Sequence, residues 1–415
     1  MARRACPEQS EGAALACSYI LSEDLVEGTI YLDNAATSFP KPDVVRHAMS
    51  TFCRQSGVNP GRSGCDLGLR AEAMVFGTRK KLTAFFNRSL VKAGREKDPN
   101  RLCFTPNATA SLNFIVNGCL SPGDHVVTTI VEHNSVIRPV NHFTKRGGES
   151  TYVGADPEGY VDPEEIRRAI RKNTRLVIVN HASNVIGVVQ DIEAIGAVCR
   201  DEGVPFAIDA AQTAGILPID MKECNISYLA FTGHKGLFGP TGIGGICVAD
   251  DARICPSLYG GTGVNSADPY HVEEWPHTLE AGTQNLGGIA GLDAAQDWLA
   301  EKGIDNIYKH EIGLLSMLMD GLKKIDKVTI HGHTRTDRRV AVCSFTIEGR
   351  NPAEVGTFLD VDYNILTRTG LECAPLIHKH LGTFPKGTIR FSIGPFNTED
   401  HIQQAIKAVH EIASQ

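Results

Sequence analysis

The sequence predicts an α/β fold, with a large, doubly wound and mainly parallel sheet domain followed by a smaller α+β domain. From residue 101 onward, short apolar runs typical of buried strands alternate with helix-like segments. Polar residues follow several of these runs directly, at the sheet edge where such folds bind their ligands. The chain of 415 residues is also long enough for two domains, each with its own core.

Composition narrows the class of protein. Hydrophobic residues make up 42% of the chain and charged residues 21%, as in an ordinary globular enzyme. The net charge of −7 gives no electrostatic reason to bind nucleic acid or an anionic membrane. The twelve cysteines form no C-x-x-C pair, so neither a metal site nor a disulfide scaffold is predicted. We therefore expect a cytoplasmic protein whose cysteines are reduced.

The domain boundaries follow from these patterns. Residues 1–29 are expected to be a poorly ordered extension, because the stretch after Arg3 and Arg4 is too polar for a signal peptide. The large domain is predicted over residues 30–289 and the small domain over residues 290–415. The first strand, at Ile30–Leu32, can join either domain.

Each strand is predicted from a short apolar run, and each helix from a longer segment between two runs. The large-domain strands are predicted at Leu102–Thr105, His125–Val131, Arg175–Asn180, Val204–Ile208 and Tyr228–Phe231. The helices are predicted at residues 69–86, 108–120, 134–145, 163–172 and 192–202, with another from about residue 287. The small domain is predicted to contain strands at Val328–His331, Ala341–Ile347 and Thr388–Ile393, and Thr398 is expected to cap the last helix.

Two strand ends carry an acid and a lysine. Asp209 follows one apolar run, and Lys235 ends the segment Thr232–Gly233–His234–Lys235 after the next. A lysine at the edge of a core loses hydration, which lowers its pKa and makes it a better nucleophile. This pair fits the chemistry of pyridoxal 5'-phosphate (PLP), in which a lysine forms a Schiff base and an acid keeps the pyridine nitrogen protonated.

These motifs resemble the class V aminotransferase family of fold-type I PLP-dependent transferases, and within it the cysteine desulfurase and selenocysteine lyase group. The resemblance extends over nearly all of residues 30–415. It is carried by four segments, Asp33–Thr37, Asp209–Gln212, Thr232–Lys235 and Arg368–Pro375.

The resemblance implies a cofactor site and a homodimer. Lys235 would hold PLP, Asp209 would pair with the ring nitrogen, and Gln212 would contact the phenolic oxygen. Asn184 would lie near the ring, and His133 would stack on it and move protons. The phosphate would be held by Thr109, Thr232 and His234, with Thr283 reaching in from the second subunit.

The substrate side is implied in the same way. Asn34 and Ala35 are expected beside the substrate, and Arg390 is expected to bind its carboxylate through the planar guanidinium. Arg368 is a second substrate-side cation. Arg62 is a third candidate, with a solvated loop arginine as the alternative.

Cys373, in Arg368–Pro375, stands where the desulfurases of this family carry their nucleophile. The implied reaction converts L-cysteine to L-alanine, with a persulfide on Cys373 that passes to an acceptor protein or small thiol in sulfur metabolism. Selenocysteine lyase acting on L-selenocysteine, another lyase or transaminase of the family, and a non-catalytic scaffold stay open as alternatives. Glu372 precedes Cys373 where relatives often carry histidine. Its carboxylate is expected to disfavour the thiolate, and Arg368 to favour it.

Overall fold

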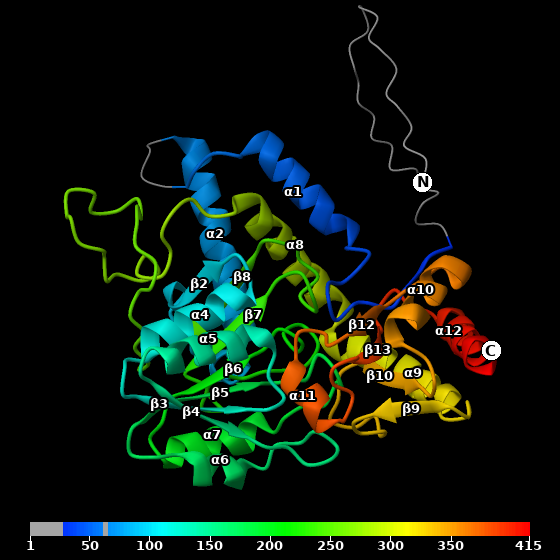
Figure 1. Cartoon of the computed structure of the whole chain (residues 1–415). Helices are drawn as coiled ribbons and strands as arrows, with labels where there is room; N and C mark the ends of the chain where they lie inside the picture. The colour runs from blue at the N-terminus through cyan, green and yellow to red at the C-terminus, as the bar shows by residue number, and fades with distance from the viewer. Residues whose placement is uncertain (1–27, 61–64) are drawn as a thin grey trace, which may run out of the picture.

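The computed structural model describes residues 28–60 and 65–415. The expected N-terminal extension, up to residue 27, and Arg62 lie outside these residues. The described chain forms a seven-stranded sheet, a four-stranded sheet and a two-stranded sheet (Figure 1). No helix in the described part of the chain is long and apolar enough to span a membrane.

The seven-stranded sheet has the order β2-β8-β7-β6-β5-β3-β4. Its strands are β2 (Leu102–Thr105), β3 (His125–Thr129), β4 (Glu149–Val153), β5 (Thr174–Asn180), β6 (Phe206–Asp209), β7 (Tyr228–Thr232) and β8 (Gly244–Val248). Neighbouring strands from β4 to β7 are parallel, whereas β8 is antiparallel to both β7 and β2. The predicted mainly parallel α/β sheet is therefore confirmed.

Two strands of this sheet were missing from the sequence prediction. β4 lies at the sheet edge, and its polar, half-exposed residues give no apolar run. β8 begins with Gly244 and Gly245, which lower strand propensity. Glycine is needed there because a Cβ on Gly244 would lie 2.6 Å from the Phe231 carbonyl oxygen, too close for any side chain.

Helices cover both faces of the large sheet. On one face, α4 (Ala108–Cys119) and α5 (Asn134–Lys145) share a hydrophobic core with the strands. On the other face, a second core joins the strands to four helices. These are α2 (Asp66–Phe85), α6 (Pro163–Ala169), α7 (Ile192–Asp201) and α8 (Leu286–Lys302). In Figure 1, α6 and α7 lie below the sheet, and α1 (Asp43–Gln55) lies at the top near α8.

The four-stranded sheet is antiparallel, in the order β12-β13-β10-β9. Its strands are β9 (Val328–His331), β10 (Val342–Ile347), β12 (Arg368–Gly370) and β13 (Thr388–Ser392). It packs with α9 (Ile304–Leu322), α10 (Pro352–Tyr363) and α12 (Glu399–Ser414) around a separate core. Thr398 caps α12 as predicted, accepting a hydrogen bond from the His401 N–H.

The two cores show how the chain divides. β1 (Ile30–Tyr31) pairs in parallel with β11 (Ile365–Leu366), and Ile30 lies in the core of the small domain. The predicted boundary at residues 289 and 290 falls inside α8. Along α9 the packing changes from the large-domain core at Ile307 to the small-domain core at Leu314.

The segment that leads to Cys373 begins with a strand. Arg368–Gly370 forms β12, in which Arg368 lies opposite Arg390 of β13. After a turn at residues 371–374, the short helix α11 (Pro375–His380) begins. The remaining short elements are α3 (Arg88–Lys92) and the 3₁₀ turn η2 (Pro99–Arg101).

Candidate active site

A pocket of about 580 Å³ lies at the carboxyl ends of the large-sheet strands, where the small domain meets them. Most of the predicted site residues line it: Ala35, Thr109, His133, Asn184, Asp209, Gln212, Thr232, His234, Lys235, Arg368, Cys373 and Arg390. They come from segments that are far apart in the sequence. Parallel strands bring these segments together, because their carboxyl ends share one edge of the sheet.

The strand ends fix the positions of several groups. Asp209 is the last residue of β6, and Thr232 is the last residue of β7, with Lys235 three positions further on. Thr109 lies in the first turn of α4, and His133 precedes α5 as its N-cap. The pocket therefore combines an acid, a lysine, an imidazole and a helix N-terminus.

Burial sets the charge states of Lys235 and Asp209. Loss of hydration lowers the pKa of Lys235 to about 8, although the Asp209 charge acts in the opposite direction. The pKa of the Asp209 carboxyl is raised by burial, against the hydrogen bond from the Ala211 N–H at 2.9 Å. Lys235 can therefore supply a neutral amine near neutral pH. Asp209 is well placed to stabilise a positive charge that enters the pocket.

Both histidines in the pocket are neutral. Burial, followed by the charge of Lys235, lowers the pKa of His133 to about 4. The same two causes, with Lys41 in addition, lower the pKa of His234 to about 4. A neutral imidazole can lie against an aromatic ring and can both accept and donate a proton.

Hydroxyl groups gather near the N-terminus of α4. The Thr109 Oγ1 lies 2.7 Å from the Ser135 Oγ, and the Ser135 Oγ lies 2.8 Å from the His133 Nδ1. Ser135 was missing from the sequence prediction, although it stands two residues after His133. Hydroxyls and a helix N-terminus together suit a phosphate group.

Several buried polar atoms of the pocket residues have no hydrogen-bond partner within the described chain. They are the Thr232 Oγ1, the His234 Nδ1, the Asn184 Oδ1 and the Arg390 Nε. Buried polar groups are normally paired, so these atoms indicate that a polar ligand completes the site. The available groups fit a phosphorylated pyridine aldehyde, since they offer a lysine amine, an acid for the ring nitrogen and donors for a phosphate.

Two arginines share one carboxylate on the small-domain side of the pocket. The Asp33 Oδ1 lies 2.6 Å from the Arg390 Nη2, and the Asp33 Oδ2 lies 3.0 Å from the Arg368 Nη2. Arg390 also donates from Nη1 to the Asn184 carbonyl at 3.0 Å. Asp33 directly follows the first strand and opens the motif Asp33–Thr37, but the sequence prediction gave it no role in the site.

Cys373 is an exposed residue at the rim of the pocket. Glu372, beside it, is buried, and its carboxylate accepts hydrogen bonds from His378 and Thr388. Burial raises the pKa of the Glu372 carboxyl. The Glu372 side chain is therefore engaged within the small domain, and its expected effect on the Cys373 thiol stays a prediction.

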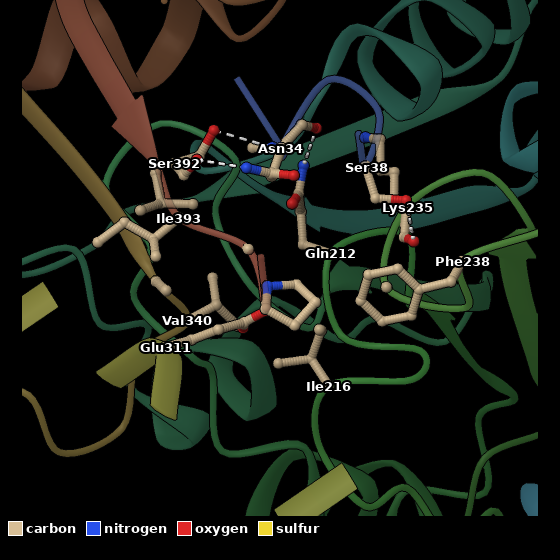
Figure 2. Close-up of a pocket in the computed structure, with 16 residues that line it drawn as sticks. Asn34, Ser38, Gln212, Ile216, Lys235, Phe238, Glu311, Val340, Ser392 and Ile393 are labelled. Carbon is tan, nitrogen blue, oxygen red and sulfur yellow. Dashed lines mark hydrogen bonds between the residues drawn. The ribbon is translucent and has the colours of Figure 1, made fainter. Parts of the chain in front are cut away.

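Asn34 and Thr283 are the predicted residues of the described chain that do not line this pocket. Asn34 faces an adjoining cavity of about 40 Å³, whose lining also includes Lys235, and donates to the Ser392 carbonyl at 3.0 Å (Figure 2). The Ala35 carbonyl accepts a hydrogen bond from the Gln212 Nε2 at 3.0 Å, so Gln212 contacts the segment that follows β1. Thr283 is exposed and does not line the pocket. The roles assigned to these residues stay predictions.

Glu311 of α9 faces the same small cavity (Figure 2). Its side chain is buried at 3% exposure, and this burial raises the pKa of the carboxyl to about 8. It is therefore largely neutral at physiological pH. Among the described residues, no group of three or more acidic, histidine or cysteine side chains could hold a metal ion.

Known proteins match the chain over most of its length. The model of the family "Aminotransferase class-V" matches residues 30–405. A probable cysteine desulfurase of Methanothermobacter thermautotrophicus is 34% identical, over 94% of this chain and 96% of that relative. A probable cysteine desulfurase of Pyrococcus abyssi is 32% identical, over 94% of this chain and 95% of that relative.

Solved structures agree with the sequence matches. The apo cysteine desulfurase of Thermococcus onnurineus NA1 superposes with a TM-score of 0.85 at 32% identity, covering 93% of this chain and 95% of that one. The cysteine desulfurase CsdA of Escherichia coli gives a TM-score of 0.82 at 27% identity over the same shares. The chain therefore belongs to the class-V aminotransferase family.

Proposed function

We propose that this protein is a PLP-dependent cysteine desulfurase that converts L-cysteine to L-alanine and forms a persulfide on Cys373. One observation carries the proposal: the Cys373 thiol stands at the rim of the pocket that contains Lys235, Asp209 and Arg390. A transaminase needs the lysine and the acid but has no use for a thiol at this place. The names of the relatives, cysteine desulfurases, point the same way.

The pocket residues have distinct roles toward the cofactor. When bound, PLP supplies an electron sink for negative charge on the substrate carbons. Lys235 would hold it covalently, and Asp209 would keep a proton on the ring nitrogen. Thr109, Thr232, His234 and the N-terminus of α4 would hold the phosphate, and His133 would lie against the ring.

The substrate carboxylate is proposed to bind Arg390. Its Nη groups are already oriented by Asp33 and by the Asn184 carbonyl, while Nε is buried and has no partner among the residues that the structure describes. A guanidinium fixed in this way loses little freedom when a carboxylate binds. Arg368, half exposed and paired with the other oxygen of Asp33, adds positive charge at the entrance.

Lys235 is proposed to move the substrate α-proton. A pKa of about 8 leaves a useful fraction of the amine neutral near pH 7.5, and a neutral amine can accept a proton. In the conjugate acid form it can return the proton to another carbon of the same substrate. Burial therefore matches the lysine to both directions of transfer.

Cys373 is proposed to carry out the sulfur transfer. Its thiolate attacks the sulfur of L-cysteine, so that an S–S bond forms as the substrate Cβ–S bond breaks. The electron pair of the broken bond stays with the substrate carbon, which takes up a proton and leaves as L-alanine. An acceptor protein or a small thiol then removes the outer sulfur and restores the Cys373 thiol.

The homodimer and the cellular location are parts of the same proposal. Large apolar side chains are exposed on α2 and on the segment between β8 and α8: Leu69, Phe76, Tyr259 and Tyr270. Such side chains mark a surface that another chain covers. In a homodimer, Thr283 of the second copy would contact the cofactor phosphate. Attack on the substrate sulfur requires Cys373 to be a reduced thiol, which favours a reducing compartment such as the cytoplasm.

Product analysis tests the function. The purified protein, supplied with PLP, is incubated with L-cysteine or L-selenocysteine, with and without a thiol reductant, and alanine and sulfide or selenide are measured. We expect one alanine for each sulfur released, and none from L-cysteine with Cys373→Ala. Turnover of selenocysteine alone would assign the protein as a selenocysteine lyase. Cysteine desulfuration at the parental rate by Cys373→Ala would refute the persulfide step.

A further inference from the structure

The turn that carries Cys373 has an unusual backbone. Glu372 has φ of 40° and Cys373 has φ of 60°, a left-handed conformation that residues other than glycine rarely adopt. Two such residues in succession are held only where surrounding contacts define them. The contacts around this turn should therefore determine where the thiol lies.

Two main-chain carbonyls of the turn accept hydrogen bonds from the large domain. The Cys373 carbonyl accepts from the Asn134 N–H at 2.7 Å, next to His133. The Glu372 carbonyl accepts from the Asn184 Nδ2 at 2.6 Å. These two contacts join the turn to the N-terminus of α5 and to the loop after β5 that carries Asn184.

The Glu372 side chain attaches the same turn to the small domain. Its carboxylate accepts from the His378 Nε2 at 3.1 Å and from the Thr388 Oγ1 at 3.3 Å. The side chains of Glu372 and His378 are both fully buried, and the His378 Nδ1 bonds the Thr383 Oγ1 at 2.8 Å. One carboxylate thus links the turn to α11 and to β13, the strand that also carries Arg390.

We propose that Glu372 is a positioning residue, which holds the Cys373 thiol over the pocket in the left-handed turn. This inference rests on the proposed function, because it assigns the residue to the desulfuration reaction. A buried carboxylate with two donors is costly to lose, since both donors are then left without their acceptor. Without this anchor the turn can relax to ordinary backbone angles, which turns the Cys373 side chain away from the substrate sulfur.

The position of the thiol matters for one step only. Substrate binding depends on Arg390 and the cofactor pocket, whereas the attack on sulfur depends on Cys373. Displacement of a reacting atom by about 1 Å can lower a rate by about 10²-fold. Loss of the anchor should therefore lower kcat and leave KM nearly unchanged.

The experiment compares Glu372→Ala, Glu372→Gln and Thr388→Val in the cofactor-loaded protein, with Glu348→Ala as a control at an exposed acid. We expect Glu372→Ala to lower kcat for alanine formation by about 10²-fold, with KM changed by less than about threefold. Glu372→Gln keeps an oxygen acceptor and should recover much of the rate. Thr388→Val removes one donor and should cause a smaller loss, and it serves as the folded probe if Glu372→Ala does not accumulate.

The outcomes separate the two proposals. Wild-type protein that makes no alanine from cysteine refutes the proposed function. If wild-type protein and the control are active while Glu372→Ala and Thr388→Val keep the parental kcat, the positioning role is refuted. A rise in KM equal to the fall in kcat would also refute it, because that result would place Glu372 in substrate binding.

Discussion

Asp33 and Arg390 form a buried ion pair in which the Oδ1 and Nη2 atoms lie 2.6 Å apart. The two residues stand at opposite ends of the described chain. Because Asp33 also pairs with Arg368, one carboxylate orients both arginines that face the pocket. The first segment of the chain thereby takes part in building the substrate side of the site.

Asp33→Asn tests this arrangement. An amide cannot hold two guanidinium groups as a carboxylate does, so Arg390 should lose its fixed orientation. We expect KM for L-cysteine to rise about tenfold, which corresponds to ~1.4 kcal/mol of binding free energy. Steady-state kinetics measure the change. Asp43→Asn is the control, because Asp43 pairs with Arg46 on the surface, and an equal effect there would contradict the assignment.

Lys235→Ala should abolish turnover. The variant lacks the amine that holds the cofactor and moves the proton, so we expect kcat to fall by about 10⁴-fold or more. Phosphate and ring contacts should still retain some PLP, which a cofactor assay after gel filtration would measure. Lys386→Ala, at an exposed lysine, is the control. Full activity of Lys235→Ala would overturn the assignment of the lysine.

Asp209→Asn should leave the fold intact and lower turnover by about 10²-fold. A neutral side chain no longer favours a protonated ring nitrogen, so the electron sink is weaker. The visible absorbance of the bound cofactor and the rate of alanine formation are the measurements. Unchanged values for both would mean that another residue holds the nitrogen.

Glu311 makes stability depend on pH. Burial raises the pKa of its carboxyl from 4.5 to about 8 in the folded protein, so between these values the unfolded chain binds fewer protons. The free energy of unfolding should therefore fall as pH rises from about 4.5 to about 8, by at most about 1.4 kcal/mol per pH unit from this group.

Glu311→Gln removes this dependence. The difference in thermal midpoint, variant minus wild type, should be larger at pH 8 than at pH 5. Scanning calorimetry of both proteins at the two pH values measures this difference. Glu348→Gln, at an exposed acid, should show no such difference. A midpoint gap for Glu311→Gln that is the same at both pH values would contradict the raised pKa.

Site residues could be predicted from the sequence where they directly follow a predicted strand. Lys235 and Asp209 each follow an apolar run, so a strand-end rule was enough to place them in one pocket. Asp33 also follows an apolar run, but its role could not be assigned because it depends on Arg390, at the far end of the chain. β8 was missed because its glycines are demanded by close packing against Phe231, which no local propensity expresses. The orientation of Glu372 depends on His378 and Thr388, and the order of residues around Cys373 does not reveal these hydrogen bonds.

The pairing of β1 with β11 also bears on the order in which the protein assembles. The large sheet is complete once the chain has been synthesised through β8, and it can begin to fold while the ribosome is still at work. β1 cannot find its partner until residues 365 and 366 have emerged, long after its own synthesis. The segment leading to Asp33 therefore waits unpaired through most of translation, and the substrate side of the pocket is finished last.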